Sequence, residues 1–487
     1  MPRLVRHLAA SSLVALLLAG CGTLEPAYHR PGLPTPDVFP DAGQSQAAVS
    51  VQPAAGLAWR AVFLDPKLRA TIDLALASNR DLRVAILNID SARAQYRVQR
   101  ADLLPHVSAG FGADIGREPA SSGGAVTPGA PDHINLHQYT ASVGVSGYEL
   151  DLFGRVRSLS KAALEQYFST AEARRAAQIT LIAETANAYL TLAADKATLT
   201  TAQDTFASSG ASLDLARKRF EHGVASQLDV RQAETLVQQA RADVANDQAI
   251  VAQDKNALDL VTGAPVPADL IPEGLDNRIM LRADLPAGLP SEVLLARPDV
   301  LEAEHQLKAA NARIGAARAA FFPSITLTAS DGRTSPALST LFMGSSAIWS
   351  FTPQVNLPLF AGGANLANLD QAKAQQKIAV AQYEKAIQTA FREVADALAR
   401  HATIDEQLGA DEAGVAAAAD SLSLSQARYD RGSDTYLNVL IAQRTLYSAQ
   451  QALISARLLR STNLVNLYTT LGGGGAIEAA APEPRVR

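Results

Sequence analysis

Apolar and polar residues alternate with a period of two in four stretches of the chain. They are His106–Ile115 and Tyr139–Ser146 in the first half, and Ser324–Ala329 and Ala347–Leu359 in the second. Successive side chains of a strand point to opposite faces, so each stretch predicts a strand with one apolar and one polar face. The pattern indicates two strand pairs, at about residues 106–152 and 324–359.

Long stretches without proline follow the strand pairs, from Val156 to Ala264 and from Leu359 to Ala481. One proline inside a helix costs about 3 kcal/mol, so these runs predict long continuous helices. In each run one Gly follows a basic and aromatic segment, at Gly223 and at Gly432. Such a Gly ends a helix. Each run therefore predicts a helical hairpin, with tips at residues 219–230 and 428–439.

The chain contains an internal duplication. The two tips align without gaps, with Gly223 opposite Gly432, and the start of the first strand, Leu103–Val107, matches Phe321–Ile325. The expected organisation is a signal peptide (1–20), a lipidated extended segment (21–60), a first repeat (61–264), a linker or equatorial region (265–298), a second repeat (299–471) and a flexible tail (472–487).

The N-terminus has the features of a secretory signal. Arg3 and Arg6 precede the apolar run Leu8–Leu18, which is shorter than the ~20 residues that a membrane-spanning helix needs. Small residues then lead directly into Cys21, the only cysteine. This arrangement predicts a bacterial lipoprotein in which Cys21 becomes the mature N-terminus and carries diacylglycerol and palmitate. The alternative is an ordinary signal peptide followed by a chance cysteine.

Composition narrows the function classes. The net charge is −5 and no basic patch occurs, so nucleic acid is not an expected partner. There is no phosphate-binding loop, no HExxH motif and no cysteine cluster, so we expect neither an enzyme nor a cofactor or metal site. His133 and His137 are four residues apart, but they are expected in a solvated loop where it joins a strand.

The strands have the marks of an outer-membrane barrel: each pair is joined by a long polar loop, and aromatic residues recur at strand ends. Half-buried strands of a soluble protein are the alternative. Four strands do not close a barrel, and lipid does not tolerate an open sheet edge, so the chain is expected to oligomerise. The residues expected to face lipid are Val107, Phe111, Val143, Val145, Ile325, Leu327, Trp349 and Phe351.

Several motifs in this order are similar to one family. They include Trp59–Leu68, Tyr148–Arg155, Arg297–Glu304 and Pro358–Gly363. Together with the duplication, they resemble the TolC-like outer-membrane efflux factors, most closely the lipoprotein branch of NodT/OprM type. The resemblance covers the chain from about Cys21 to Leu471. It implies a mixed α and membrane β fold: a homotrimeric outer-membrane β-barrel with four strands per protomer, continued by a periplasmic α-helical tunnel.

The resemblance also implies a function and partners. The protein would be the outer-membrane channel of a tripartite efflux pump, a passive exit duct for drugs or other small molecules. A periplasmic adaptor and an inner-membrane pump of the resistance-nodulation-division (RND) type would complete the machine. Type I protein secretion and metal-ion efflux are variants, and a structural coiled-coil lipoprotein is an alternative of another class.

In the family the helical tips close the periplasmic entrance. By alignment to that motif, Leu437 is expected to form an apolar ring on the axis. Asp434 and Asp229 are the nearby acids. Arg219, Arg428 and Arg431 are the candidates to pair with them and hold the tips shut.

Overall fold

The computed structural model describes residues 22–39, 58–119, 133–275 and 291–473. The predicted lipidation site, Cys21, lies outside these residues. The described chain falls into two compact units. Unit 1 contains described parts of Met1–Pro31, Ile89–Thr170 and Ala303–Gln382; unit 2 contains those of Gly32–Asn88, Ala171–Glu302 and Tyr383–Arg487. Each unit draws on both sequence repeats, so the compact units do not follow the duplication.

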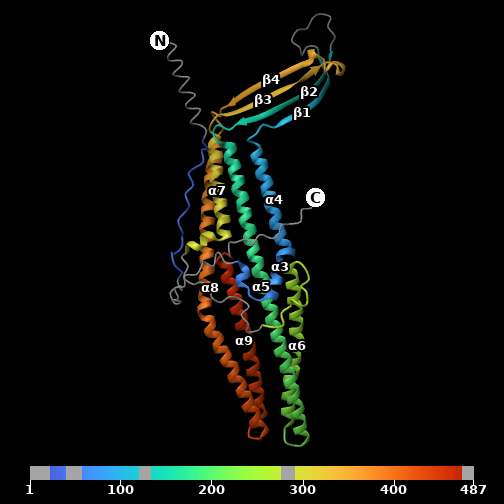
Figure 1. Ribbon diagram of the computed structural model, residues 1–487, viewed down its shortest axis with the longest axis vertical. Coiled ribbons are helices and arrows are strands. Elements are labelled where there is room, and N and C mark those ends of the chain that lie inside the picture. Colours follow the sequence, from blue (N-terminus) through green and yellow to red (C-terminus); the bar gives the residue numbers. More distant parts are fainter. Residues whose placement is uncertain (1–21, 40–57, 120–132, 276–290, 474–487) are drawn as a thin grey trace. The chain divides into compact units, whose positions relative to one another are not determined.

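Unit 1 holds one antiparallel sheet (Figure 1). Its strands are β1 (Val107–Pro119), β2 (His133–Leu150), β3 (Ser324–Ser335) and β4 (Ala347–Asn356). They pair in chain order, so β1 and β4 form the two edges of the sheet. The helices α4 (Arg80–Ala101) and α7 (Pro298–Ala319) precede β1 and β3.

The strands of the first pair are longer than the alternation predicts. β1 continues past Ile115 to Pro119, and β2 begins at His133 rather than at Tyr139. His133 and His137 therefore lie within β2, not in a loop, which corrects the sequence-based placement. Backbone pairing continues where the side chains become polar, and alternation of apolar residues marks only the apolar part of a strand.

A β-bulge interrupts the pairing of β2 with β3 between Val145 and Tyr148. Gly147 adopts a φ of 67° there, and its N–H donates to Thr328 Oγ1 at 3.2 Å. A bulge adds one residue to one strand, so it changes which residues share a face. Here the extra residue returns Tyr148 and Leu150 to the face that carries Val145. The sequence pattern did not reveal this shift.

An extended N-terminal strap, residues 22–31, packs along the helices of unit 1. Arg318 Nη1 donates to the backbone oxygen of Leu24 at 3.1 Å, and Asn311 Nδ2 donates to that of Pro26 at 2.8 Å. Near its start, a Cβ added at Gly154 would lie only 2.7 Å from Thr23 Cα. The strap is therefore packed tightly where β2 ends and the next helix begins.

Unit 2 is built from helices. It contains α2 (Trp59–Val62), α3 (Pro66–Ser78), η3 (Ser291–Ala296) and most of two long hairpins. The first hairpin joins α5 (Arg155–Glu221) to α6 (Gln227–Thr262), and the second joins α8 (Ala364–Asp430) to α9 (Tyr436–Thr470). The turns are shorter than the predicted tips, because the helices run almost to Gly223 and Gly432.

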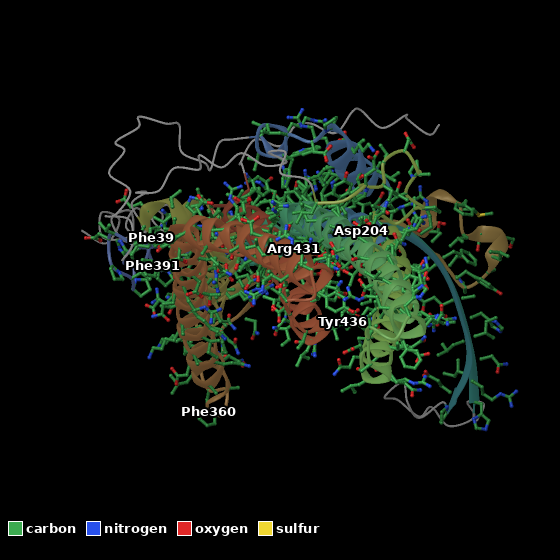
Figure 2. All side chains as sticks on the ribbon, turned by 90° about the horizontal axis from the view of Figure 1, so that it is seen from below. Phe39, Asp204, Phe360, Phe391, Arg431 and Tyr436 are labelled. Atoms are coloured by element: carbon green, nitrogen blue, oxygen red, sulfur yellow. The ribbon has the colours of Figure 1, made fainter. Side chains whose placement is uncertain are left out.

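Aromatic and polar contacts fix other segments of unit 2. Phe39 is 2% exposed and stacks on Phe391 of α8 with ring centroids 4.7 Å apart (Figure 2). Asn79 accepts from the backbone N–H of Leu82 at 2.8 Å, capping α4, and donates to the backbone oxygen of Val261 at 2.7 Å. These contacts anchor the start of α4 to the end of α6.

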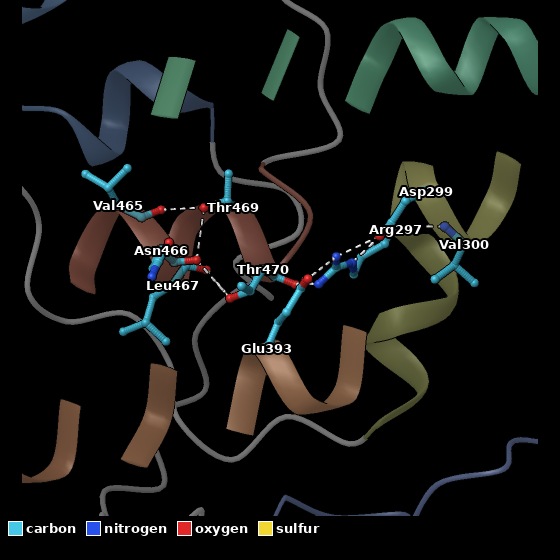
Figure 3. Close-up of polar contacts among 9 residues, drawn as sticks. All are labelled: Arg297, Asp299, Val300, Glu393, Val465, Asn466, Leu467, Thr469 and Thr470. Carbon is cyan, nitrogen blue, oxygen red and sulfur yellow. Dashed lines mark hydrogen bonds and ion pairs between the residues drawn. The ribbon is translucent and has the colours of Figure 1, made fainter. Parts of the chain in front are cut away.

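A buried arginine ties three segments of unit 2 together (Figure 3). Arg297 donates from Nε and Nη2 to the two carboxylate oxygens of Asp299, at 3.0 and 2.7 Å. Nη2 also lies 2.8 Å from Glu393 Oε2 on α8, and Nη1 donates to the backbone oxygen of Thr470 at 2.8 Å. Burial opposes the charge, but Asp299 and Glu393 raise the pKa of Arg297, so it stays protonated.

We expect Arg297→Gln to destabilise unit 2. The change removes charged hydrogen bonds to Asp299, Glu393 and the end of α9, each worth ~1.5–3 kcal/mol in general, and water replaces part of the loss at the half-exposed carboxylates. A loss of about 2 kcal/mol in the free energy of unfolding should appear in denaturant titrations. Arg392→Gln, an exposed change beside Glu393, is the matched control. Equal stability of the two variants would contradict the role given to Arg297.

Candidate functional site: the two faces of the sheet and the two helical tips

The register of the sheet places all eight residues expected to face lipid on one face. Directly opposed residues of antiparallel strands share a face. Val107 lies opposite Val145, and Ile325 lies opposite Val355. The face continues across all four strands through Val107, Phe111, Val143, Val145, Ile325, Leu327, Trp349 and Phe351. The eight residues therefore share one face, and the contact of that face with lipid remains a prediction.

This apolar face is open in the single chain. Trp349 is 79% exposed and Val107 is 69% exposed. The face becomes charged toward the loops, where Asp331 lies opposite Trp349 and Arg333 lies opposite Ala347. The alternation in the sequence did not identify these two charges as part of the same face. They limit the apolar band on β3 to residues up to Ala329.

The opposite face is polar and carries mainly small hydroxyl residues. Ser330 Oγ lies 2.8 Å from Ser350 Oγ, and Gln138 Nε2 donates to Thr334 Oγ1 at 3.2 Å. Glycines bring neighbouring strands close on this side: a Cβ on Gly144 would meet the backbone oxygen of Ala329. Uncharged polar residues of this face include Ser108, Gln138, Thr140, Ser142, Thr326, Thr328, Ser330, Thr334, Ser350, Thr352 and Gln354, and the face also carries the acids Asp114, Glu118 and Glu149.

The two helical tips end in the same backbone motif. In the first, the N–H of Val224 donates to the oxygen of Arg219 at 2.9 Å, and Gly223 has a φ of 72°. In the second, the N–H of Ser433 donates to the oxygen of Arg428 at 3.0 Å, and Gly432 has a φ of 73°. This is the Schellman arrangement, which favours glycine at the left-handed position. Gly223 and Gly432 therefore each lie in a turn that ends a long helix.

The two tips differ in where their acids lie. Asp229 is in a capping box with Ser226: it accepts from the Ser226 N–H at 2.9 Å, and its own N–H donates to Ser226 Oγ at 3.2 Å. Asp229 therefore caps the start of its own helix, α6, and does not form the expected pair with an arginine of the described chain. At the corresponding point of the second tip stands Asn438, which donates to Asp434 Oδ1 at 2.5 Å.

Asp434 is the acid that does pair with an arginine. Arg428 Nε lies 3.1 Å from Asp434 Oδ2. Hydrogen bonds from the backbone N–H of Thr435 and from Asn438, with the charge of Arg428, hold the pKa of Asp434 below its usual range. The carboxylate therefore stays ionised near neutral pH. It connects the end of α8 to the start of α9.

Arg219 contacts an aromatic ring instead of an acid. Its guanidinium lies 4.3 Å from the centroid of the Tyr429 ring, and Nη1 donates to the backbone oxygen of Tyr429 at 3.4 Å. Tyr429 and Tyr436 also belong to a buried cluster that joins the two hairpins. Arg431 makes no ion pair among the described residues, and it is exposed. The arginines thus have three different environments.

Leu437 is 49% exposed, beside the buried Tyr436 and Val439. Its counterpart in the first tip, Leu228, is 65% exposed. Neither leucine belongs to the buried cluster that joins the two hairpins. Each is available to contact a further copy of the chain.

Two other features bear on function. No helix in the described part of the chain combines the length and the apolar character needed to cross a bilayer. The described residues also contain no group of three or more His, Cys, Asp or Glu side chains arranged to hold a metal ion.

The chain matches the family model described as outer membrane efflux protein over residues 71–264 and 289–473. It therefore belongs to the outer membrane efflux protein family. This finding confirms the resemblance drawn from the sequence motifs, and it makes the protein an efflux channel of the Gram-negative outer membrane.

Individual relatives agree with this assignment. The chain is 49% identical over 473 residues to the probable efflux pump outer membrane protein TtgC of Pseudomonas putida, covering 97% of this chain and 96% of that protein. It is 42% identical to outer membrane protein OprJ of Pseudomonas aeruginosa, over 95% of each chain. The relatives are efflux channel proteins, and no catalytic family is indicated.

Solved structures share the fold. A membrane protein from Pseudomonas aeruginosa superposes with a TM-score of 0.86 at 40% identity, over 94% of this chain and 99% of that one. The open state of the MtrE outer membrane channel from Neisseria gonorrhoeae gives 0.79 at 38% identity, over 93% and 99%.

Which face of β2 contacts lipid can be tested by introducing one charged residue on each face in turn. We expect Val143→Arg to reduce the amount of assembled protein in the membrane, because a charge on the lipid side near the midplane costs about 2–4 kcal/mol. Ser142→Arg, the neighbouring matched control on the polar face, should assemble normally and alter conductance. The amount of assembled oligomer on native gels would measure the difference between the two variants. A reversed order of the two yields would mean that the polar face contacts lipid.

Proposed function

We propose that this chain forms, as a homotrimer, the exit duct of a tripartite efflux pump for small organic molecules. The observation that carries the proposal is one sheet with an apolar face, a face of small hydroxyl residues and two unpaired edge strands. Joined edge to edge, copies of this sheet close a barrel with an apolar outside and a polar, water-filled inside.

The need for several copies follows from strand number. One chain supplies four strands, whereas single-chain outer-membrane barrels have at least about eight. Closure by β1 of one copy with β4 of the next satisfies the backbone groups of both edges. The number three rests on the family resemblance, and the structural likeness to outer-membrane channels of the same family supports it.

The lining supports organic compounds as cargo. Hydroxyl and amide groups, which bind uncharged polar molecules by hydrogen bonds, dominate the polar face, which also carries the acids Asp114, Glu118 and Glu149. Two Pseudomonas putida relatives at 49% identity are described as an antibiotic and a toluene efflux pump outer membrane protein. Only three Met are present in the chain, which does not favour a path for soft metal ions.

Energy would come from partners. The sequence has no phosphate-binding loop, so a periplasmic adaptor would join the duct to an inner-membrane pump of the RND type. The relatives described as pump components support this arrangement. The exposed ends of the helical hairpins, including Leu228 and Leu437, are the part of the described chain best suited to meet the adaptor.

A lipid on Cys21 would anchor the assembly. The first described residues after it pack at Gly154, where β2 leaves the sheet and α5 begins. That position is at the end of the apolar face, which would be the membrane surface. Acyl chains contribute about 0.8 kcal/mol per buried CH₂, so more than one chain binds the membrane firmly.

The anchor predicts a defined mature N-terminus. Mass spectrometry of the N-terminal peptide should find Cys21 first, bearing diacylglycerol and an amide-linked acyl chain. Cys21→Ala should abolish the lipid and leave assembly intact, because the sheet itself holds the oligomer in the membrane. Residues retained before Cys21, or a bare thiol, would exclude the anchor.

The second tip would be the gate. A ring of Leu437 from three copies, and the Arg428–Asp434 pair that orders each turn, would hold the periplasmic end closed. Exposed ion pairs contribute only about 0–1 kcal/mol each, so the closed state depends on three symmetric copies acting together. An adaptor that binds the open form better would shift the population by its difference in affinity.

Planar-bilayer recording tests both duct and gate. The purified protein should conduct ions, and Leu437→Ala with Asp434→Ala should raise the single-channel conductance without lowering the amount of oligomer. Leu228→Ala, at the matching site of the first tip, should leave conductance unchanged. A protein that never conducts would exclude the duct. Unchanged conductance in the assembled double variant would move the constriction away from the second tip.

A further inference from the structure

Three aspartates gather inside the first hairpin of unit 2. Asp195 lies on α5, and Asp247 and Asp254 lie two helical turns apart on α6. The carboxyls of Asp195 and Asp254 are within hydrogen-bonding reach of each other, and the charge of Asp247 also acts on Asp195. None of the three has been assigned a part in the sheet, the tips or the gate.

The cluster contains buried oxygens without a donor. Asp247 is 9% exposed, and its Oδ2 accepts no hydrogen bond from the described residues. Its Oδ1 accepts from Asn246 Nδ2 at 3.3 Å. Asp254 Oδ2 is likewise buried with no donor. Two ionised carboxylates cannot form a hydrogen bond with each other, so the Asp195–Asp254 contact is attractive only when one of them keeps a proton.

Cations near the cluster are engaged elsewhere. On α6, Lys255 pairs with Asp259 at 2.7 Å, and on α5, Lys196 donates to the backbone oxygen of Pro272 at 2.7 Å. On α3, Lys67 lies 3.5 Å from Glu273 and Arg69 donates to the backbone oxygen of Arg60.

The groups of α6 and α9 that interact electrostatically with Asp247 include an acid and a phenol. Asp243 of α6 accepts from Gln239 Nε2 at 2.9 Å, and its charge acts on Asp247. Tyr447 of α9 faces Asp243 and Asp247. Burial raises the pKa of Tyr447, and the charges of the two aspartates raise it further. The cluster therefore has acids and a neutral phenol around it.

We propose that Asp195 and Asp254 share one proton, and that this proton holds the α5–α6 hairpin together. The site is thus a proton-binding site built into the wall of the proposed duct. Its loss leaves two adjacent carboxylates and the buried Asp247 in mutual repulsion, which loosens the contact between α5 and α6 below the start of α4.

The direction of the pH dependence follows from burial. Removal from water, and then Asp254 and Asp247, raise the pKa of Asp195 from 3.8 to about 7. The unfolded chain releases this proton as the pH rises through about 4, whereas the folded chain keeps it until about 7. The free energy of unfolding therefore falls as the pH rises between these values and levels off above. The folded hairpin therefore binds the proton more tightly than the unfolded chain does.

The test compares thermal unfolding midpoints of the purified, assembled protein from pH 5 to pH 8 at one scan rate. The unaltered protein should lose stability between pH 5 and pH 7. Asp195→Asn, which keeps the shape of the protonated acid, should have a higher midpoint at pH 8 and a flatter profile. Asp204→Asn, an exposed change on the same helix (Figure 2), is the matched control and should follow the unaltered protein.

Two further results decide the proposal. The infrared band of a protonated carboxyl should be present in the unaltered protein at pH 6 and lost by pH 8, and this measurement stands even if a variant fails to assemble. Absence of that band at pH 6, or parallel profiles of Asp195→Asn and the unaltered protein, would overturn the shared proton. Stabilisation by Ca²⁺ at pH 8 in the unaltered protein, but not in Asp195→Asn, would replace the proton by a divalent cation and also overturn it.

Discussion

The unpaired edges of β1 and β4 are the constraint on which the rest depends. A sheet of four strands in lipid leaves two rows of backbone groups without partners, and each such group costs several kcal/mol. Closing these edges with other copies requires that every copy present the same face outward. The bulge at Gly147 meets this requirement, because without it Tyr148 and Leu150 would point to the polar side. The bulge in β2 is therefore needed for the copies to close their edges with the apolar residues of every strand on the same side.

The turns of the two hairpins are stabilised by different contacts. At the first tip, Asp229 and Ser226 satisfy the start of α6 locally, so that turn does not depend on a charged partner. At the second tip, the acid is at Asp434, and Arg428, Thr435 and Asn438 all bind it. One substitution in the second turn therefore affects both helix ends at once. A turn held by a single carboxylate is a suitable place for a transition between two states.

The sequence predicted the parts of the fold that depend on local periodicity. Alternation located the strands, and the position of Gly223 and Gly432 after a basic last turn located the tips. It could not predict features that depend on residues distant in the chain. The bulge becomes visible only through the pairing of Val145 and Tyr148 with β3. The contact of Arg297 with Glu393 and Thr470 joins positions about a hundred or more residues apart, and an Arg-Pro-Asp segment contains no local sign of it. For the tips, the identity of the candidate residues was predictable, but the choice of Asp434 over Asp229 as the arginine's partner was not.

Within unit 2, the buried charge of Arg297 has partners of opposite sign, whereas the carboxyls of the aspartate cluster have none among the described residues. Around Arg297 all three guanidinium nitrogens donate hydrogen bonds, so the ionised groups stabilise the junction of η3, α8 and α9. Around Asp195 the described residues offer no cation, and two buried oxygens have no donor. A lysine at position 195 or 254 would supply a cation to the aspartate cluster, as Arg297 supplies one to Asp299 and Glu393. A buried carboxyl without a cation is stable only as the acid. The packing of the α5–α6 hairpin therefore loosens as the pH rises, whereas Arg297 stays protonated at its own junction over the same range.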